Sequence, residues 1–209
     1  IYLNGNFKEN KKHGIGTLYH KNENCKVNGQ WEDDMLFYGI EYWENGIQKY
    51  EGTFKNDKYF GESTFYLENG NLYYEGTFLD GLKHGYGKEY LNNNIIYEGD
   101  WINNYKSGYG KIYNNNILEY DGYFFNNIKS GYGKLYLKNI IYIGYLLNDL
   151  YEGKGELNIN NILYYKGLFK SGLKHGKGIL YKNKYILYEG DFYNDCKQGL
   201  GIIYFDNST

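Results

Sequence analysis

The residues of this chain that could do chemistry recur at regular intervals instead of clustering. Three of the four histidines, which could ligate a metal or act as a general base, stand directly before a G-x-G tripeptide. They are His13, His84 and His175. Acidic residues, the usual general acids and bases, recur in the tripeptide Y-[ED]-G, and lysines that could bind anions recur two residues before the G-x-G. What these groups can do together depends on the elements that carry them.

Those elements are internal repeats of about 23 residues. A tripeptide Y-x-G, followed two residues later by an aromatic residue, opens each repeat, and the pattern G-x-G-x-φ-Y, where φ is apolar, closes most of them. The opening glycines are Gly5, Gly29, Gly52, Gly76, Gly99, Gly122, Gly144, Gly167 and Gly190. The chain is therefore predicted to be a single array, residues 1–209, with units beginning near residues 3, 27, 50, 74, 97, 120, 142, 165 and 188.

Each half of a repeat has the alternation of a short β-strand. In the fullest unit, Tyr97, Gly99 and Trp101 are two residues apart and so share one face of a strand. The segment 102–107 is predicted to connect this strand to its antiparallel partner at 108–113, after which asparagines make the next turn. Glycine weakens a strand unless something packs on its bare backbone, and rings from neighbouring strands are the obvious candidates. The fold class is therefore predicted to be all-β.

The repeat spacing keeps the candidate catalytic groups apart. Strands lie about 4.8 Å apart in a sheet, so equivalent residues of successive units are about 10 Å apart. His13, His84 and His175 are then separated by roughly 30 and 40 Å, whereas the ligands of one ion lie about 2 Å from it. Cys25 and Cys196 are likewise too far apart for a disulfide. The acids form a flat row without the facing arrangement that a glycosidase needs. We expect no enzyme, no catalytic residues, no metal site and no cofactor.

The composition excludes further classes. The chain contains no Ala, Arg or Pro, and 21% of its residues are aromatic, which argues against a helical bundle and against disorder. The net charge of −2 and the lack of Arg remove the usual means of reading phosphate and guanine, so we expect no nucleic-acid partner. No apolar run is long enough to span a membrane. With two cysteines and no signal peptide, we expect a cytoplasmic location.

The repeated pattern Y-E-G-x-[WF], six residues, then G-x-G, resembles the MORN (membrane occupation and recognition nexus) repeat from Tyr2 to Tyr204. Departures from the family pattern stand at Leu3, Val27, Glu41, Ser63 and Leu146. The resemblance implies an elongated, single-layer, twisted antiparallel sheet of nine two-stranded hairpin repeats. It also implies a non-enzymatic scaffold linked to membranes or to the cytoskeleton of protists, and homodimers through terminal repeats in some members.

One repeated surface is an aromatic ladder. A single-layer sheet cannot bury both faces, so we expect some rings to line an open groove for a protein partner, such as an amphipathic helix or a cytoskeletal component. The groove candidates are Tyr74, Phe78, Tyr97, Trp101, Tyr120, Phe124, Tyr165 and Phe169. Candidates for self-association as a homodimer are Phe192, Tyr204 and Phe205. A thin core of the same rings is the alternative.

A second repeated surface is a row of lysines that would project from one edge of the sheet. Such a row could meet a phosphoinositide membrane, at about 1 kcal/mol per lysine. The candidates are Lys83, Lys106, Lys129 and Lys174, and the row is interrupted at Phe37, Tyr59 and Tyr151. Ordinary solvated lysines in turns are the alternative.

The sequence thus predicts a scaffold that binds a protein partner, at the cytoskeleton or the inner face of a membrane. Two alternatives stay open. The chain could be a recognition module for anionic phospholipids, or an accessory repeat domain of an enzyme outside it, such as a SET-type methyltransferase or a lipid kinase.

Overall fold

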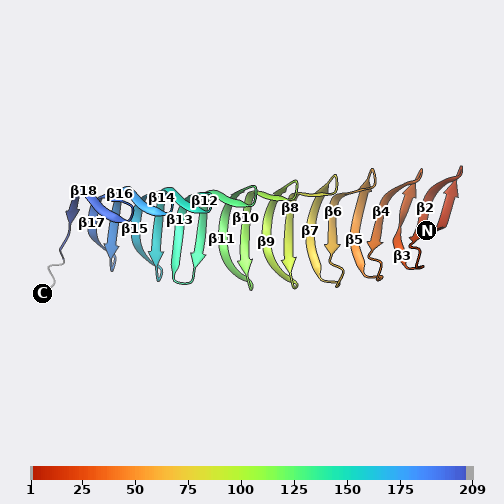
Figure 1. Ribbon diagram of the computed structural model, residues 1–209, viewed down its shortest axis with the longest axis horizontal. Helices are drawn as coiled ribbons and strands as arrows, with labels where there is room; N and C mark the ends of the chain where they lie inside the picture. The colour runs from red at the N-terminus through yellow and green to blue at the C-terminus, as the bar shows by residue number, and fades with distance from the viewer. Residues whose placement is uncertain (1, 206–209) are drawn as a thin grey trace. The chain divides into compact units, whose positions relative to one another are not determined.

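The computed structural model describes residues 2–205, and over these residues the regular structure is all β, with eighteen strands and no helix (Figure 1). The chain divides into two compact units, Ile1–Tyr105 and Lys106–Thr209. The first nine strands are β1 (Leu3–Lys8), β2 (Lys11–Tyr19), β3 (Cys25–Glu32), β4 (Met35–Tyr42), β5 (Gln48–Lys55), β6 (Lys58–Tyr66), β7 (Leu72–Leu79), β8 (Leu82–Leu91) and β9 (Asn94–Ile102). The others are β10 (Tyr105–Asn114), β11 (Ile117–Phe125), β12 (Ile128–Leu137), β13 (Ile140–Leu147), β14 (Leu150–Ile159), β15 (Ile162–Lys170), β16 (Leu173–Lys182), β17 (Tyr185–Tyr193) and β18 (Cys196–Ile203).

Within each unit, every strand pairs antiparallel with the strand before it and the strand after it, so the order in the sheet is the order in the chain. Consecutive strands make the hairpins that the repeat predicts. The predicted fold class, an all-β antiparallel sheet of two-stranded hairpin repeats, is therefore confirmed.

The turns are shorter than the sequence suggested. The predicted six-residue connection at 102–107 is wrong, since β9 continues to Ile102 and β10 begins at Tyr105. Only Asn103 and Asn104 form the turn, with φ of 49° and 70°. Two consecutive residues with positive φ give a turn whose twist matches that of the strands, and asparagine accepts this conformation more readily than most residues.

The core of each unit is a row of tyrosines on one face of the sheet. The tyrosine that opens each full repeat is almost entirely buried, and its hydroxyl donates a hydrogen bond to the backbone carbonyl three residues later. For Tyr142 and Tyr165 these bonds, to the carbonyls of residues 145 and 168, measure 2.7 and 3.0 Å. A buried phenol therefore keeps a hydrogen-bond partner in every repeat that opens with a tyrosine, which offsets the cost of burying it.

Glycine is required beneath these rings, as the sequence indicated. A Cβ built on Gly155 would lie 2.6 Å from Cε2 of Tyr142, so the ring rests directly on bare backbone. The first glycine of the G-x-G has a different role. Gly85, for example, has φ of +66°, in the left-handed region that glycine adopts without strain.

Candidate interaction surfaces

The structure places all eight predicted groove residues in the core. None of them is more than 5% exposed, and Tyr74, Tyr97, Tyr120 and Tyr165 are fully buried. The thin-core alternative describes their position, and a partner could contact these rings only if the side chains above them moved. Their role toward a partner stays a prediction, and any open groove must be lined by other residues.

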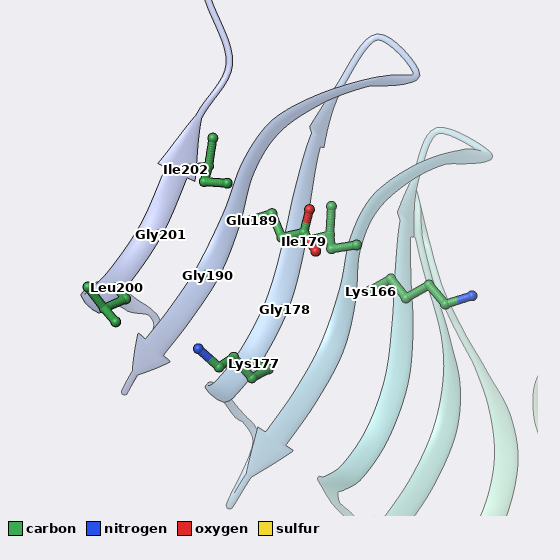
Figure 2. Close-up of a pocket in the computed structure, with 9 residues that line it drawn as sticks. All are labelled: Lys166, Lys177, Gly178, Ile179, Glu189, Gly190, Leu200, Gly201 and Ile202. Atoms are coloured by element: carbon green, nitrogen blue, oxygen red, sulfur yellow. The ribbon is translucent and has the colours of Figure 1, made fainter.

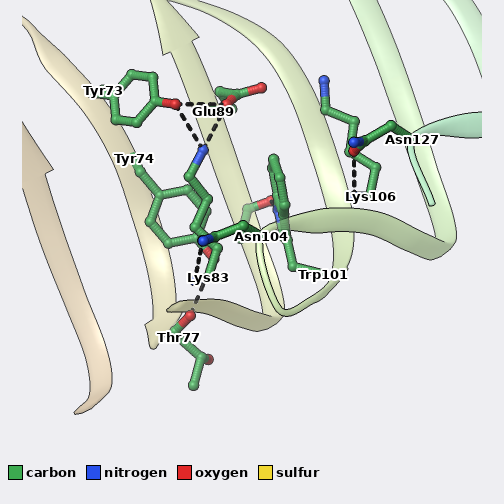
Figure 3. Close-up of polar contacts among 10 residues, drawn as sticks. Tyr73, Tyr74, Thr77, Lys83, Glu89, Trp101, Asn104, Lys106 and Asn127 are labelled. Atoms are coloured by element: carbon green, nitrogen blue, oxygen red, sulfur yellow. Dashed lines mark hydrogen bonds and ion pairs between the residues drawn. The ribbon is translucent and has the colours of Figure 1, made fainter. Parts of the chain in front are cut away.

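The lysine row supplies part of the cover over this core. The Lys83 ammonium lies 2.6 Å from a carboxylate oxygen of Glu89 and 3.1 Å from the hydroxyl of Tyr73 (Figure 3). The same ammonium is 4.4 Å from the ring centroid of Trp101 and 5.1 Å from that of Tyr74. Lys83 is only 8% exposed. Its charge is therefore satisfied inside the sheet by a carboxylate and aromatic faces, and its role toward a lipid stays a prediction.

Other lysines of the row also fold back. Lys129 pairs with Asp149 at 3.4 Å, and Lys174 pairs with Asp195 at 3.1 Å. Each ammonium also lies less than 6 Å from the centroid of the core tyrosine of its own repeat. Lys129 and Lys174 thus cover apolar rings with their aliphatic stems while their charged ends have a carboxylate partner. The role of Lys83, Lys106, Lys129 and Lys174 toward a lipid stays a prediction.

Hydrogen bonds join the turn after β9 and the turn after β11 to the preceding repeat. The backbone N–H of Lys106 donates to Oδ1 of Asn127 at 2.8 Å, and the N–H of Asn127 donates to the carbonyl of Lys106 at 2.9 Å (Figure 3). Lys83 makes the same pair of bonds with Asn104. The sequence analysis missed this contact, although Asn or Asp at the second turn position, about 21 residues after the lysine, was a readable signal.

Where the lysine row is interrupted, other side chains cover the core. Tyr59 stacks on Tyr50 with ring centroids 3.9 Å apart. Tyr151 stacks on Tyr142 at the same distance. In the hairpin of β3 and β4, the covering residue is Leu36, which is 7% exposed and not the predicted Phe37, which is 57% exposed. At this position of the repeat, the core is therefore covered by a lysine, a tyrosine or a leucine side chain.

Burial also fixes the protonation of the core. It raises the pKa of Tyr165 to about 12, and it raises the pKa of Tyr74, Tyr97 and Tyr120 still further. The desolvation of the phenolate is the largest cause in each case. These hydroxyls therefore remain hydrogen-bond donors throughout the physiological pH range.

The opposite face of the sheet is open. In the second unit it carries half-exposed tyrosines, and Tyr132 and Tyr145 make an edge-to-face pair with centroids 5.6 Å apart. Beside this pair lies a cavity of about 540 Å³, lined by Leu168, Lys154 and Lys166 among others. A second cavity of about 710 Å³ shares Lys166 and Lys177 with the first and continues over β16 to β18, where Ile179, Glu189, Leu200 and Ile202 line it (Figure 2).

The open face of the first unit carries carboxylates paired with hydroxyl groups. Glu62 accepts a hydrogen bond from Thr77, and Glu51 accepts one from Tyr38. Tyr90 donates to Glu75 at 2.8 Å, so acidic groups and their hydroxyl partners occupy this face.

The groups considered for catalysis do not come together. Among residues 2–205, no group of three or more His, Cys, Asp and Glu side chains could hold a metal ion. The thiols of Cys25 and Cys196 are both free, and burial raises the pKa of Cys25. Of the self-association candidates, Phe192 is 4% exposed, whereas Tyr204 and Phe205 are 41% and 81% exposed. Their role in self-association stays a prediction.

The fold and the repeated core define a protein built from β-hairpin repeats. The model of the MORN repeat family matches seven segments, at residues 4–25, 50–72, 74–95, 97–116, 120–139, 165–184 and 188–209. These segments cover more than half of the chain, which therefore belongs to the MORN repeat family, whose repeats are interaction modules for proteins or membranes. No curated protein matches the chain. Over the described residues, no helix is long and apolar enough to cross a membrane.

Proposed function

We propose that this protein is a non-enzymatic scaffold whose second unit binds a protein partner on its open face. The observation that carries the proposal is the pair of adjoining cavities of about 540 and 710 Å³, which share Lys166 and Lys177. Their apolar lining includes Tyr145 and Leu168, side chains that remain accessible while the tyrosine core behind them is full. Tyrosines of this kind are among the residues that dominate binding energy at interfaces.

The partner that fits best is an amphipathic helix with acidic residues beside its apolar stripe. A helix is about 10–12 Å wide with its side chains, which suits a shallow trough between two rows of side chains. Lys154, Lys166 and Lys177 would face the acidic residues. Lys166 and Lys177 pair with Glu156 and Asp191 in the free protein, so they would exchange one carboxylate for another. Such exchange favours selectivity over affinity.

The test is affinity capture with matched variants. Tyr145→Ser combined with Leu168→Asp removes the apolar anchors of the first cavity. Phe125→Ser is the control, because Phe125 is 64% exposed and lines neither cavity. We expect a partner that the wild type and the control retain and the double variant loses, with the same melting temperature for all three proteins. Equal capture by the double variant would overturn the proposal.

We further propose a cytoplasmic location at the cytoskeleton or the inner face of a membrane, and self-association through Tyr204 and Phe205. The family membership and the exposure of these two side chains support this. Sedimentation equilibrium of the wild type and of Tyr204→Ser with Phe205→Ser tests the second part. A dimer that persists in the variant would contradict it.

A further inference from the structure

Three lysines on the open face of the second unit depart from the pattern of the other repeats. The residue between the two glycines of G-x-G is a lysine only at Lys154 and Lys177, and the middle residue of Y-x-G is a lysine only at Lys166. The three repeats before Lys154 carry a tyrosine at the first position, namely Tyr86, Tyr109 and Tyr132, and most repeats carry an acid at the second, namely Glu51, Glu75, Glu98, Asp121 and Glu189. Since the glycines of these repeats pair in the same way, the change concerns the surface and not the fold.

The three lysines belong to consecutive strands and line one cavity. Lys154 lies on β14, Lys166 on β15 and Lys177 on β16, and all three line the cavity of about 540 Å³. Lys166 and Lys177 also line the adjoining cavity, where Figure 2 shows their side chains. Because neighbouring strands lie about 4.8 Å apart, the three strands span only about 10 Å. The flexible lysine stems can therefore bring three ammonium groups to one bound group.

This cavity carries an excess of positive charge. Among the residues that line it, three ammonium groups face one carboxylate, that of Glu156, which leaves two positive charges. Lys166 pairs with Glu156 at 2.9 Å and Lys177 pairs with Asp191 at 2.8 Å, whereas Lys154 stands opposite the apolar Leu168. The side chains of Lys166 and Lys177 are 59% and 72% exposed, so a ligand reaches them from solvent. The charge of the cavity matches that of a dianion.

The end of the cavity at β12 and β13 is aromatic. Tyr132 and Tyr145 pair opposite each other there, with ring planes at 76°. Tyr145 is 54% exposed, so its ring can accept a further aromatic ring in the edge-to-face manner that it already has toward Tyr132. Leu168 adds an apolar side chain beside Lys154. A ligand that carries both a ring and a dianion would therefore contact both parts of the cavity.

We propose that this cavity binds the side chain of a phosphotyrosine in the protein partner. A phosphoryl group carries close to two negative charges and three acceptor oxygens, so it can accept hydrogen bonds from all three lysines. The phenyl ring would lie against Tyr145 and Leu168. The phosphotyrosine would stand among the acidic residues of the partner on the open face, so this proposal rests on the proposed function. Phosphorylation of that tyrosine would strengthen the complex.

Other anionic groups use less of the cavity. A carboxylate brings one charge and two oxygens to three ammonium groups. A phosphoserine brings the dianion without a ring, and the phosphate of a lipid headgroup likewise brings no aromatic ring to Tyr145. Phosphotyrosine is the side chain that contacts both the lysines and the aromatic wall.

The experiment titrates the full chain at pH 8 with three probes and follows binding by NMR. Phenyl phosphate is the phosphorylated ring of phosphotyrosine, phenyl sulfate keeps the ring with a single charge, and methyl phosphate keeps the dianion without the ring. The amide resonances of Gly155 and Gly167, which line the cavity, report binding, and that of Gly99 in the first unit is the internal control. We expect phenyl phosphate to bind about tenfold more tightly than either analogue, because each analogue lacks one of the two contacts. Equal affinity for phenyl phosphate and either analogue would overturn the proposal.

Two double variants locate the binding. Lys154→Tyr with Lys177→Tyr restores the residue that the preceding repeats carry, and it should weaken the binding of phenyl phosphate by about tenfold or more. Lys170→Tyr with Lys182→Tyr removes the same charge from exposed positions of the same unit that line neither cavity, and it should keep the wild-type affinity. Equal melting temperatures of the three proteins check that the fold is kept. Undiminished binding to the first variant, or the same loss in both, would contradict the proposal.

The phosphotyrosine site and the proposed function fail in different experiments. A partner may be lost by the Tyr145→Ser/Leu168→Asp variant while phenyl phosphate shows no preference over its analogues. The partner then binds the open face without a phosphotyrosine, and only the phosphotyrosine site is wrong. If phenyl phosphate instead binds with the expected preference while that variant keeps every partner, the proposed function is wrong, and so is the assignment of the phosphate to a protein partner.

Discussion

The hairpins β3–β4 and β7–β8 have equivalent pairings but different chemistry. In β7–β8, Tyr74 is fully buried, and Lys83 covers it with a paired charge. In β3–β4, Val27 and Leu36 hold the same positions, with 6% and 7% exposure and no polar atom to satisfy. The MORN family model matches residues 74–95 but has no match at residues 26–49. The strand pairing of a repeat can therefore stay the same while its buried and covering side chains change from polar to apolar.

The largest difference between the two hairpins should appear when their buried side chains are truncated. Tyr74→Ala is expected to cost about 3–5 kcal/mol of unfolding free energy, the range for large aromatic side chains. Val27→Ala removes far less apolar volume and is expected to cost about 1–2 kcal/mol. Urea unfolding of the two variants measures both values. Equal losses would mean that the tyrosine row is not the main source of stability.

Alkaline pH should weaken the tyrosine-containing hairpins selectively. Burial raises the pKa of Tyr74 and Tyr97 above the ordinary value near 10, and it raises the pKa of Tyr165 to about 12. The unfolded chain therefore loses these protons first, so the stabilisation is complete below pH 10 and declines as the pH rises toward 12 and beyond. Urea midpoints at pH 8 and pH 11 measure the decline. Tyr74→Phe is the control and should show a smaller one, while an unchanged wild-type midpoint would contradict the prediction.

A smaller effect is expected from the covering position. Lys83→Met removes a charged hydrogen bond at 2.6 Å to Glu89 and should cost about 1.5–3 kcal/mol. Leu36→Met is close to volume-conserving and should cost less than about 1.5 kcal/mol. Thermal unfolding gives the comparison. Adding Glu89→Leu to Lys83→Met should recover part of the loss, because Leu180 stands opposite Tyr165 at the equivalent place. No recovery would mean that packing, and not the charge, decides the cost.

Much of the fold could be predicted because its pattern is local. The two-residue alternation of Tyr97, Gly99 and Trp101 predicted that these residues share a face, and the bare backbone of glycine predicted that rings rest on it. Which face is buried was not predicted. The length of the turn at Asn103 and Asn104 was predicted wrongly, because the strands extend further than the glycine pattern does.

The surfaces were harder to predict for a physical reason. Whether Lys83 projects into solvent or folds over a ring depends on its partners, and Glu89 is six residues away along the same strand while Trp101 comes from the next repeat. The sequence alone also does not reveal that Leu36, and not Phe37, turns inward, because strand β4 lacks the left-handed glycine present at Gly85 in β8.

The paired hydrogen bonds between a lysine backbone and the following turn have an evolutionary consequence. Each pair joins only neighbouring hairpins, as between Lys129 and Asp149 or Lys174 and Asp195. A gene segment encoding one whole period can therefore be duplicated or lost, and the hairpins on either side meet with the same donors and acceptors as before. An insertion that is not a whole number of repeat periods would separate the donor from its acceptor. Selection can thus change the length of such a protein in whole periods while each hairpin diverges by itself.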